Sequence, residues 1–338
     1  MTARLRSWCL ARIAPFIMPA TRTLSMAEPT AAAPKPPSTG KKVGFAPKPP
    51  STGEKVVLVL VVALPLLGLG LAIYQLWNQL VGWREIALFL TFYALTTLGI
   101  GAGYHRMLTH RGFRSPAPVR FVMLVLGSMA LEGTPVFWAA AHLKHHARSD
   151  REGDPHSPLH GFWHAHVGWL FSRGLKVEPI YYQSFRQDRV AQFVSKTFWL
   201  WALLSFALPF GIGYLLGGWP GAWGGLVWGG LVRVLFNHHV TWSVNSVCHT
   251  FGRQDFDTPD RSRNEWVIGL LALGEGWHNN HHAYPRSAVH GLKWYQFDLS
   301  GLVIRLLAKL RLAKDVQTVP KEQWKADMEK HRRHAPPH

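Results

Sequence analysis

The chain has little charge, few acidic residues and almost no cysteine. Only 17% of its 338 residues are charged, whereas a soluble domain usually carries about 25%. Its two cysteines, Cys9 and Cys248, cannot form a disulfide framework, which excludes a secreted cysteine-rich fold. With 48% hydrophobic residues and 16 tryptophans, the chain is too apolar to be disordered. This composition is typical of a membrane protein.

The positive charge, +18 in total, is concentrated at the two ends of the chain. Residues 1–55 carry nine lysines and arginines against two acids, and residues 301–338 carry nine against four. Basic terminal segments of this kind are typical of proteins that face an anionic membrane surface. No nucleic-acid-reading motif accompanies them, so we expect no nucleic-acid partner.

The first 54 residues are predicted to be a disordered, proline-rich basic tail. The sequence Pro-Lys-Pro-Pro-Ser-Thr-Gly occurs at 34–40 and again at 47–53, and such polar sequence cannot bury a core. Residues 1–25 resemble a transit peptide or precede a true start at Met26, and in either case they are not expected in the mature chain. Residues 55–300 are predicted to form a membrane domain, and 301–338 a basic C-terminal tail.

Four apolar runs predict four transmembrane helices, at about 56–76, 86–103, 197–216 and 222–242. A shorter apolar stretch at 118–131 is typical of an interfacial helix. Four spans place both termini on one side. The positive-inside rule makes that side cytoplasmic, because the long segment 104–196 is rich in arginine and histidine, while Arg84 is the only positively charged residue of the two opposite turns. We therefore expect an all-α, four-helix transmembrane bundle.

Histidines occur in four clusters at the cytoplasmic ends of these helices. On a helix, positions i, i+3 and i+4 share one face, so each His-x-x-His-His box presents three imidazoles to one point. The i, i+5 pair in the first cluster needs a bent or terminal helical turn. Nine histidines are too many for one metal ion and predict two, of a metal that imidazole suits: Zn, Cu, Fe or Ni. The predicted ligands are His105, His110, His142, His145, His146, His249, His278, His281 and His282, with Asn245 acting through water.

The ordered combination of these motifs resembles the membrane fatty acyl desaturases, the family that includes stearoyl-CoA desaturase and the bacterial and cyanobacterial acyl desaturases. The matching segments are 105–110, 138–146, 154–158, 161–169, 241–249 and 274–282. The resemblance implies a cytoplasmic helical cap, two Fe²⁺ ions held by the nine histidines, and O2 as co-substrate. It also implies the insertion of a cis double bond, typically at carbon nine, into a saturated acyl chain.

The resemblance further implies substrate contacts at Trp138, Trp169, Thr241, Trp242 and Arg173. It departs from the animal acyl-CoA enzymes just before the second histidine box, where Ala140-Ala141 replaces an Arg-Asp pair that engages the CoA head group. Acyl-CoA, an acyl chain on a membrane lipid and an acyl chain on a carrier protein therefore all remain open as substrates. Asp154, Glu275 and Asn280 are candidate hydrogen-bond partners that orient ligand imidazoles.

The electron donor is not part of this chain, which has no haem-binding motif and no cysteine cluster. We expect a separate ferredoxin, rubredoxin or cytochrome with its reductase, and a location in a bacterial inner membrane. One alternative is a membrane di-iron hydroxylase of fatty acids, sterols or alkanes. Another is a metal carrier, which should hold its ligands midway along its spans, whereas these histidines lie at one end.

Overall fold

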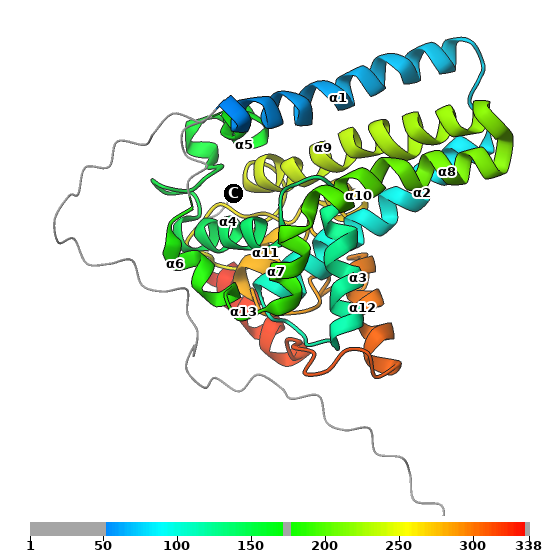
Figure 1. Ribbon diagram of the computed structural model, residues 1–338. Coiled ribbons are helices and arrows are strands. Elements are labelled where there is room, and N and C mark those ends of the chain that lie inside the picture. Colours follow the sequence, from blue (N-terminus) through cyan, green and yellow to red (C-terminus); the bar gives the residue numbers. More distant parts are fainter. Residues whose placement is uncertain (1–51, 172–176, 335–338) are drawn as a thin grey trace, which may run out of the picture.

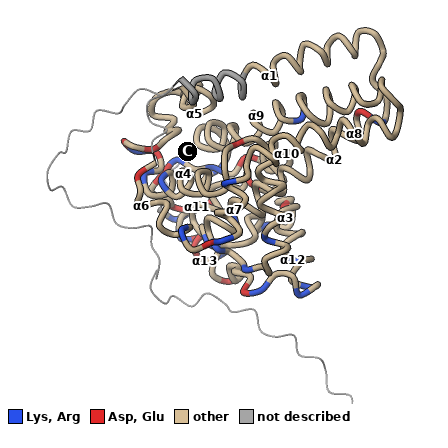
Figure 2. The backbone as a smooth tube through the Cα atoms, in the orientation of Figure 1, with Lys and Arg blue, Asp and Glu red and all other residues tan. Residues whose placement is uncertain are grey.

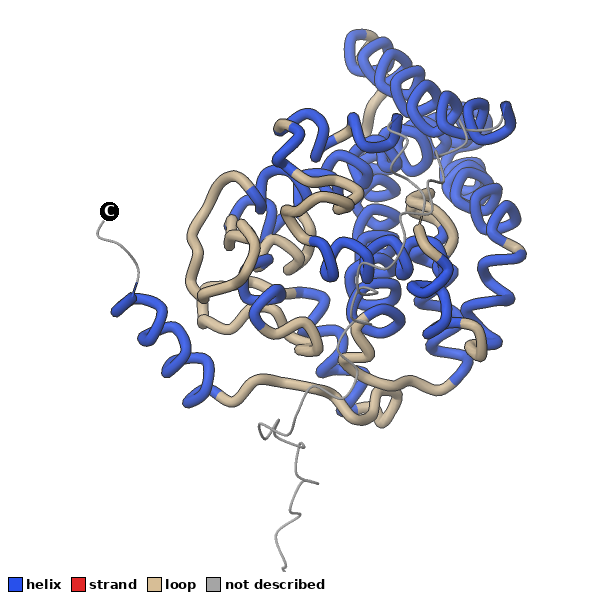
Figure 3. The backbone as a smooth tube through the Cα atoms, turned by 90° about the vertical axis from the view of Figure 1, so that its left-hand side faces the viewer, coloured by secondary structure: helices blue, strands red, loops and turns tan. Residues whose placement is uncertain are grey.

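The computed structural model describes residues 52–171 and 177–334, where the chain forms helices joined by loops and no β-strand (Figures 1 and 3). The helices are α1 (Thr52–Trp77), α2 (Trp83–Leu98), η1 (Gly99–Thr109), α3 (Ala117–Ser128), α4 (Pro135–Arg148), η2 (Pro158–His160), α5 (Phe162–His166), η3 (Gly168–Phe171), α6 (Pro179–Tyr182), η5 (Gln183–Phe185), α7 (Arg189–Lys196), α8 (Phe198–Gly225), η6 (Leu226–Val232), α9 (Arg233–Ser246), η7 (Val247–His249), α10 (Trp266–Leu271), α11 (His278–Ala283), α12 (Leu299–Lys309) and α13 (Lys321–His334). The expected all-α class is confirmed for this part of the chain. Most of the N-terminal tail, residues 1–51, and Arg173 lie outside the described residues.

Two continuous helices, Trp83–Thr109 and Phe198–His249, are long and apolar enough to cross a membrane. The second runs out and back, because its backbone leaves helical geometry at Gly217 and Gly218. Gly218 has a φ of +60°, which favours glycine. Gly213 and Gly221 face each other across this turn so closely that a Cβ on Gly213 would lie 2.1 Å from the carbonyl oxygen of Gly221. The two limbs cover the apolar runs expected at 197–216 and 222–242.

Long helices and charged side chains occupy different parts of the molecule. In Figure 2 the lysines, arginines and acids gather around α4, α6, α11 and α13, while α1 and the far ends of α2 and α8 carry few. Large apolar side chains on these helices are more than half exposed: Leu66, Leu67, Leu90, Leu203 and Leu215. Soluble monomers rarely expose apolar surface of this extent, so the protein associates with a membrane.

Helix α1 lies along η6 and α9 (Figure 1). Gly68 allows the approach, since a Cβ there would lie 2.3 Å from the Cβ of Leu231. Its described apolar part, Ala63–Trp77, is shorter than the span expected at 56–76. No side chain of residues 52–62 is described, so that prediction is only partly covered.

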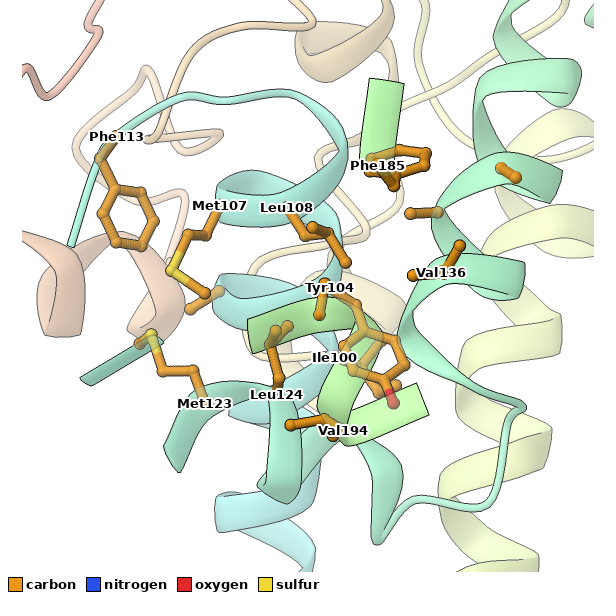
Figure 4. Packing of buried hydrophobic residues seen from close by; sticks show 14 of the residues in the cluster. Ile100, Tyr104, Met107, Leu108, Phe113, Met123, Leu124, Val136, Phe185 and Val194 are labelled. Atoms are coloured by element: carbon orange, nitrogen blue, oxygen red, sulfur yellow. The ribbon is translucent and has the colours of Figure 1, made fainter. Parts of the chain in front are cut away.

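The largest hydrophobic core lies where η1 packs between α3 and α4 (Figure 4). Tyr104 and Leu124 are completely buried there, and Phe185 closes the cluster from η5. Gly99 allows η1 to touch α3, because a Cβ at this position would lie 2.2 Å from the backbone nitrogen of Gly127. Since η1 and α4 carry histidines at their ends, this core sets their relative position.

The segment that joins α3 to α4 is attached to α9. The Arg233 guanidinium is completely buried and donates hydrogen bonds to the carbonyl oxygens of Met129 at 2.8 Å and Ser205 at 3.0 Å. One and a half turns further on, His238 Nε2 lies 3.0 Å from the carbonyl oxygen of Ala130. Leu131, which follows, adopts a φ of +61°. Helix α9 therefore fixes an irregular segment that runs directly into α4.

The basic C-terminal segment folds back onto the histidine-bearing half of the molecule. Helix α13 buries Trp324 in a small hydrophobic cluster with Phe256 and Val319. The Tyr284 hydroxyl, just after α11, donates a hydrogen bond to Asp327. Residues 301–334 therefore include ordered helices that support α11 from outside.

Candidate metal centre

The structure brings all nine predicted histidines together in two adjacent buried groups. Cluster one contains His105, His110, His142, His146 and His281, and cluster two contains His145, His249, His278 and His282. Within each cluster, one ligand atom per residue lies within 4.8 Å of all the others. The clusters meet where the rings of His146 and His282 stack with centroids 4.5 Å apart.

The first histidine pair is positioned by a stretch of π-helix, η1. In an α-helix, residues five apart point about 140° away from each other. Here the turn is wider, and the His110 backbone nitrogen donates to the His105 carbonyl oxygen at 3.1 Å. The two rings therefore lie on the same side, with centroids 4.8 Å apart. This geometry is the bent turn that the i, i+5 spacing requires.

Each His-x-x-His-His box supplies both clusters, which differs from the expectation that its three rings meet at one point. Helix α4 gives His142 and His146 to cluster one and His145 to cluster two. Helix α11 gives His281 to cluster one and His278 with His282 to cluster two. Adjacent residues point about 100° apart on a helix, so His145 and His146 diverge. The i, i+4 pairs stay together, as the helical spacing predicts.

The nitrogen atoms of both clusters fit metal ligation. Two ligand nitrogens at right angles, each about 2.1 Å from one ion, lie about 3.0 Å apart. The measured Nε2–Nε2 separations are 3.1 Å for His281–His105, 2.9 Å for His281–His146, 3.0 Å for His278–His249 and 3.1 Å for His278–His282. The buried Nε2 atoms of His110 and His145 have no hydrogen-bond partner. Two all-imidazole sites therefore fit two transition-metal ions.

Most of these imidazoles are held in the neutral form that a metal ligand requires. Burial, reinforced by the neighbouring histidines, lowers the pKa well below its usual range in His110, His142, His146, His278, His281 and His282. His145 differs: burial lowers its pKa, but the nearby carboxylates Asp154, Asp150 and Asp260 together outweigh burial and raise it. A neutral ring keeps a lone pair available for an ion.

Carboxylates contact the outer nitrogen, Nδ1, of four histidines. The pairs are His105 with Glu275, His145 with Asp154 at 3.0 Å, His249 with Asp150 at 2.9 Å and His282 with Asp260 at 2.7 Å. Such partners fix the ring orientation and direct Nε2 at the ion. Glu275 and Asp154 therefore occupy the role expected of them. The Asn280 amide instead donates to the His290 carbonyl oxygen and to Gln296.

Sequence reasoning missed Asp150 and Asp260. They lie 99 and 22 residues from the histidines that they contact, so no helical spacing connects them. Asp150 also adopts a φ of +55° and accepts a hydrogen bond from the Arg261 backbone nitrogen. Asn245 is partly buried on α9, four residues before His249.

Two of the predicted substrate residues, Trp138 and Thr241, are joined by Glu132, which sequence reasoning also missed. Glu132 accepts hydrogen bonds from Thr241 Oγ1 at 2.8 Å and Trp138 Nε1 at 3.2 Å. The Trp138 indole stacks on His142, with ring centroids 5.1 Å apart. Burial raises the pKa of Glu132 to about 7. These three side chains therefore form a wall directly beside cluster one.

The other two predicted substrate tryptophans meet at His166. Trp169 Nε1 donates to the His166 carbonyl oxygen at 3.2 Å, and the His166 and Trp242 rings lie edge to face with centroids 6.1 Å apart. Trp169 also approaches the buried His156, whose ring is 4.4 Å from that of His145 in cluster two. Trp138 therefore contacts cluster one and Trp169 contacts His156 beside cluster two, whereas Thr241 and Trp242 are linked to them through Glu132 and His166.

Comparison with known proteins agrees with this geometry. A sequence model of the fatty acid desaturase family matches residues 81–300. The chain is 42% identical over 251 residues to an acyl-CoA 5-desaturase of Anemone leveillei, covering 73% of this chain and 75% of the relative. It is 39% identical over 244 residues to an sn-1 stearoyl-lipid 9-desaturase of Anabaena variabilis, covering 71% and 87%.

A third relative, a hex-5-enoyl-[acyl-carrier protein] acetylenase of Moorena producens, is 37% identical over 268 residues, which cover 75% of this chain and 83% of the relative. The region that the family model matches, residues 81–300, includes every histidine of both clusters. The chain therefore belongs to the fatty acid desaturase family.

Proposed function

We propose that the protein is an O2-dependent, di-iron fatty acyl desaturase that inserts a cis double bond at carbon nine of a saturated acyl chain. The observation that carries this proposal is the pair of adjacent all-histidine clusters in a chain of this family. Two Fe²⁺ ions would occupy the two clusters, with Asn245 contacting cluster two through water. Nine neutral or carboxylate-supported imidazoles suit iron, although zinc and copper share this preference.

Bound iron would supply the oxidation. The pair of adjacent methylenes together gives two electrons and two protons, an external donor gives two more electrons, and O2 with two further protons becomes two waters. The protein's own contribution is to hold one carbon–carbon bond of the chain in place and to exclude water. Carboxylates hold the rings of His105, His145, His249 and His282 in fixed orientations.

Trp138 and Thr241 form one side of the proposed acyl site and Trp169 and Trp242 the other. Arg173, a further proposed substrate contact, lies outside the described residues. The hydrogen bonds from Trp138 and Thr241 to Glu132 keep both side chains in one conformation. Because the Trp138 indole stacks on His142, a chain lying against this wall passes next to cluster one. An apolar wall that is fixed in this way can place particular methylenes at the iron.

The substrate carrier is acyl-CoA or a membrane lipid. The relatives' own names include acyl-CoA, lipid and acyl-carrier-protein substrates, and carbon nine is supported by two stearoyl-lipid 9-desaturases. Ala140, which replaces an arginine of the animal acyl-CoA enzymes, is completely buried and offers no contact to a head group. Incubating membranes that contain the protein with labelled stearoyl-CoA and with labelled phospholipid distinguishes the carriers.

The proposed setting is a bacterial inner membrane with four spans and both termini in the cytoplasm. The two limbs of Phe198–His249, the helix Trp83–Thr109 and α1 would supply the spans. The histidine clusters and most charged residues then lie on the cytoplasmic side, where a separate ferredoxin, rubredoxin or cytochrome can dock. A net positive charge there favours an acidic donor.

Expression in a bacterial host that lacks its own unsaturated fatty acids tests the activity. Gas chromatography with mass spectrometry of the fatty acid methyl esters should show a new cis monoene at carbon nine. His145→Ala and His278→Ala each remove a ligand of cluster two, so the monoene should fall below detection and the bound iron should decrease.

His331→Ala, on α13 and away from the clusters, is the control and should leave both quantities unchanged. A hydroxy acid without new monoene would show a hydroxylase instead. Full activity of the His145 variant would contradict the assignment of the ligands.

A further inference from the structure

His290 is a tenth histidine at the metal centre, and no pattern in the sequence singles it out. It is 1% exposed, and neither of its ring nitrogens has a hydrogen-bond partner. A buried polar group without a partner is costly, so its presence here needs an explanation. Its ring lies 4.6 Å from that of His281 and 5.4 Å from that of His105, measured between centroids. Both neighbours belong to cluster one.

His290 lies outside the group of ligand nitrogens that forms cluster one. Its ligand atom lies within 4.8 Å of those of His105 and Glu275, but it does not group with the five histidines of cluster one. His290 Nδ1 is 3.6 Å from Glu275 Oε2, the same oxygen that contacts His105 Nδ1. Its ring therefore faces the outer sides of the ligands.

The outer nitrogen of His281 also lacks a partner. Its Nε2 faces His105 and His146 inside the cluster, and its buried Nδ1 has no hydrogen bond. When Nε2 binds an ion, Nδ1 carries the proton and needs an acceptor. His290 is the adjacent ring with unused nitrogens on both sides.

The backbone of His290 is held in place from two sides. Its nitrogen donates to Asp298 Oδ2 at 2.7 Å, and its carbonyl oxygen accepts from Asn280 Nδ2 at 2.8 Å. Asn280 precedes His281 on α11, so the same helix carries the ligand and positions His290. Asp298 also binds Arg106, which in turn binds Glu275. The imidazole is thus built into a fixed location.

We propose that His290 is a positioning residue that connects Glu275 to His281, so that one carboxylate orients two ligands of cluster one. When cluster one holds its ion, His281 Nδ1–H would donate to His290 Nε2 and His290 Nδ1–H to Glu275 Oε2, which lies 3.6 Å from it in this structure, while Glu275 also pairs with His105. Both histidines stay neutral, and Arg106 balances the charge of Glu275. This inference rests on the proposed metal centre.

Full-length protein in detergent, loaded with ⁵⁷Fe, allows a test with readouts other than activity. His290→Leu keeps the volume and removes both nitrogens, and His290→Gln keeps a polar group able to donate and accept. His160→Leu, at an exposed histidine, is the matched control. The measurements are Fe²⁺ affinity by chelator competition, the Mössbauer spectrum, and the melting temperature of the metal-free protein.

We expect His290→Leu to weaken the binding of one of the two ions by about 10–100-fold and to change one of two quadrupole doublets. His290→Gln should restore part of both. The metal-free melting temperature should not fall, because His290→Leu removes no side-chain hydrogen bond that exists without metal. If His290→Leu does not accumulate, His290→Asn, whose amide is too short to reach both neighbours, should show the same weakening.

Wild-type affinity and spectrum in His290→Leu would overturn this inference while leaving the proposed function intact. Equal losses at both ions together with a lower metal-free melting temperature would also overturn it, since they indicate a space-filling role. A wild-type protein that binds no iron would overturn the proposed function itself, and the role of His290 with it.

Discussion

At the scale of single residues, Glu132 is a titratable side chain in a position where an uncharged acceptor could make the same hydrogen bonds. It accepts two hydrogen bonds, from Trp138 and Thr241, and burial raises its pKa from 4.5 to about 7. Between these two values the folded protein binds more protons than the unfolded chain. Stability is therefore lost as the pH rises through this window, because the ionised carboxylate is penalised only in the folded state.

Glu132→Gln should remove this pH dependence while keeping both neighbours hydrogen-bonded, since an amide can accept from Trp138 and pair with the Thr241 hydroxyl. We expect the apparent melting temperature of the wild type to fall by a few degrees more than that of the variant between pH 5 and pH 8. Thermal unfolding of both proteins in the same detergent measures the difference. If the melting temperatures of the two proteins fall equally between pH 5 and pH 8, Glu132 does not titrate in this range.

The residues that the sequence predicted correctly are those that follow helical periodicity. Six of the nine histidines lie in the two His-x-x-His-His boxes, and their i, i+4 pairs stay together in the structure. Glu132, Asp150, Asp260 and His290 were missed for a common reason. Each lies outside a helix and contacts its partners across a spacing that follows no helical periodicity, so an isolated acid or histidine of this kind has no pattern that could single it out.

At the scale of helices, α9 acts as a support for the segment before α4. Arg233 makes four hydrogen bonds to three elements, reaching Gly229, Met129 and both the carbonyl and hydroxyl oxygens of Ser205. Hydrogen bonds from a charged donor contribute about 1.5–3 kcal/mol each. The buried guanidinium therefore holds α8, α9 and the α3–α4 segment together.

Arg233→Met should lower the free energy of unfolding by about 3 kcal/mol or more and lower the bound iron, because α4 loses its anchor. Arg84→Met is a matched control, since Arg84 makes one exposed hydrogen bond, to the Leu216 carbonyl oxygen. Thermal unfolding and metal analysis of both variants provide the measurement. Equal stability of the two variants would contradict the anchoring role.

The apolar runs predicted where the long helices lie, but not where and in what shape the first histidine helix ends. The sequence indicates a helix that ends near Gly103, whereas the structure continues it to Thr109 as π-helix. Its glycines allow α3 to approach, and the wide turn places His105 and His110 on one side. Packing against a neighbouring helix decides this geometry, so the residue pattern of one helix cannot predict it.

At the scale of the whole molecule, charge and apolar surface are segregated (Figure 2). This predicts that the α1–α2 turn and helix α13 lie on opposite sides of the membrane. In a Cys9→Ser background the remaining cysteine, Cys248, is buried, so a single cysteine placed at exposed Asn78 or Glu322 reports its side.

A membrane-impermeant maleimide should label Asn78→Cys in spheroplasts with intact inner membranes, and Glu322→Cys only after lysis. Identical labelling of the two variants before lysis would contradict the proposed four-span arrangement. The reverse pattern would show that the orientation is inverted.

The division of α4 and α11 between the two clusters has a consequence for how the protein fills with metal. Both helices contribute ligands to each cluster, so the first ion to bind fixes parts of the second site as well. The entropic cost of ordering these helices is then met once, and the second ion binds a prepared site. If the proposed iron fills both clusters in this way, scarce iron would leave fully loaded and empty chains with few half-loaded ones, and the supply of iron would set the number of working molecules.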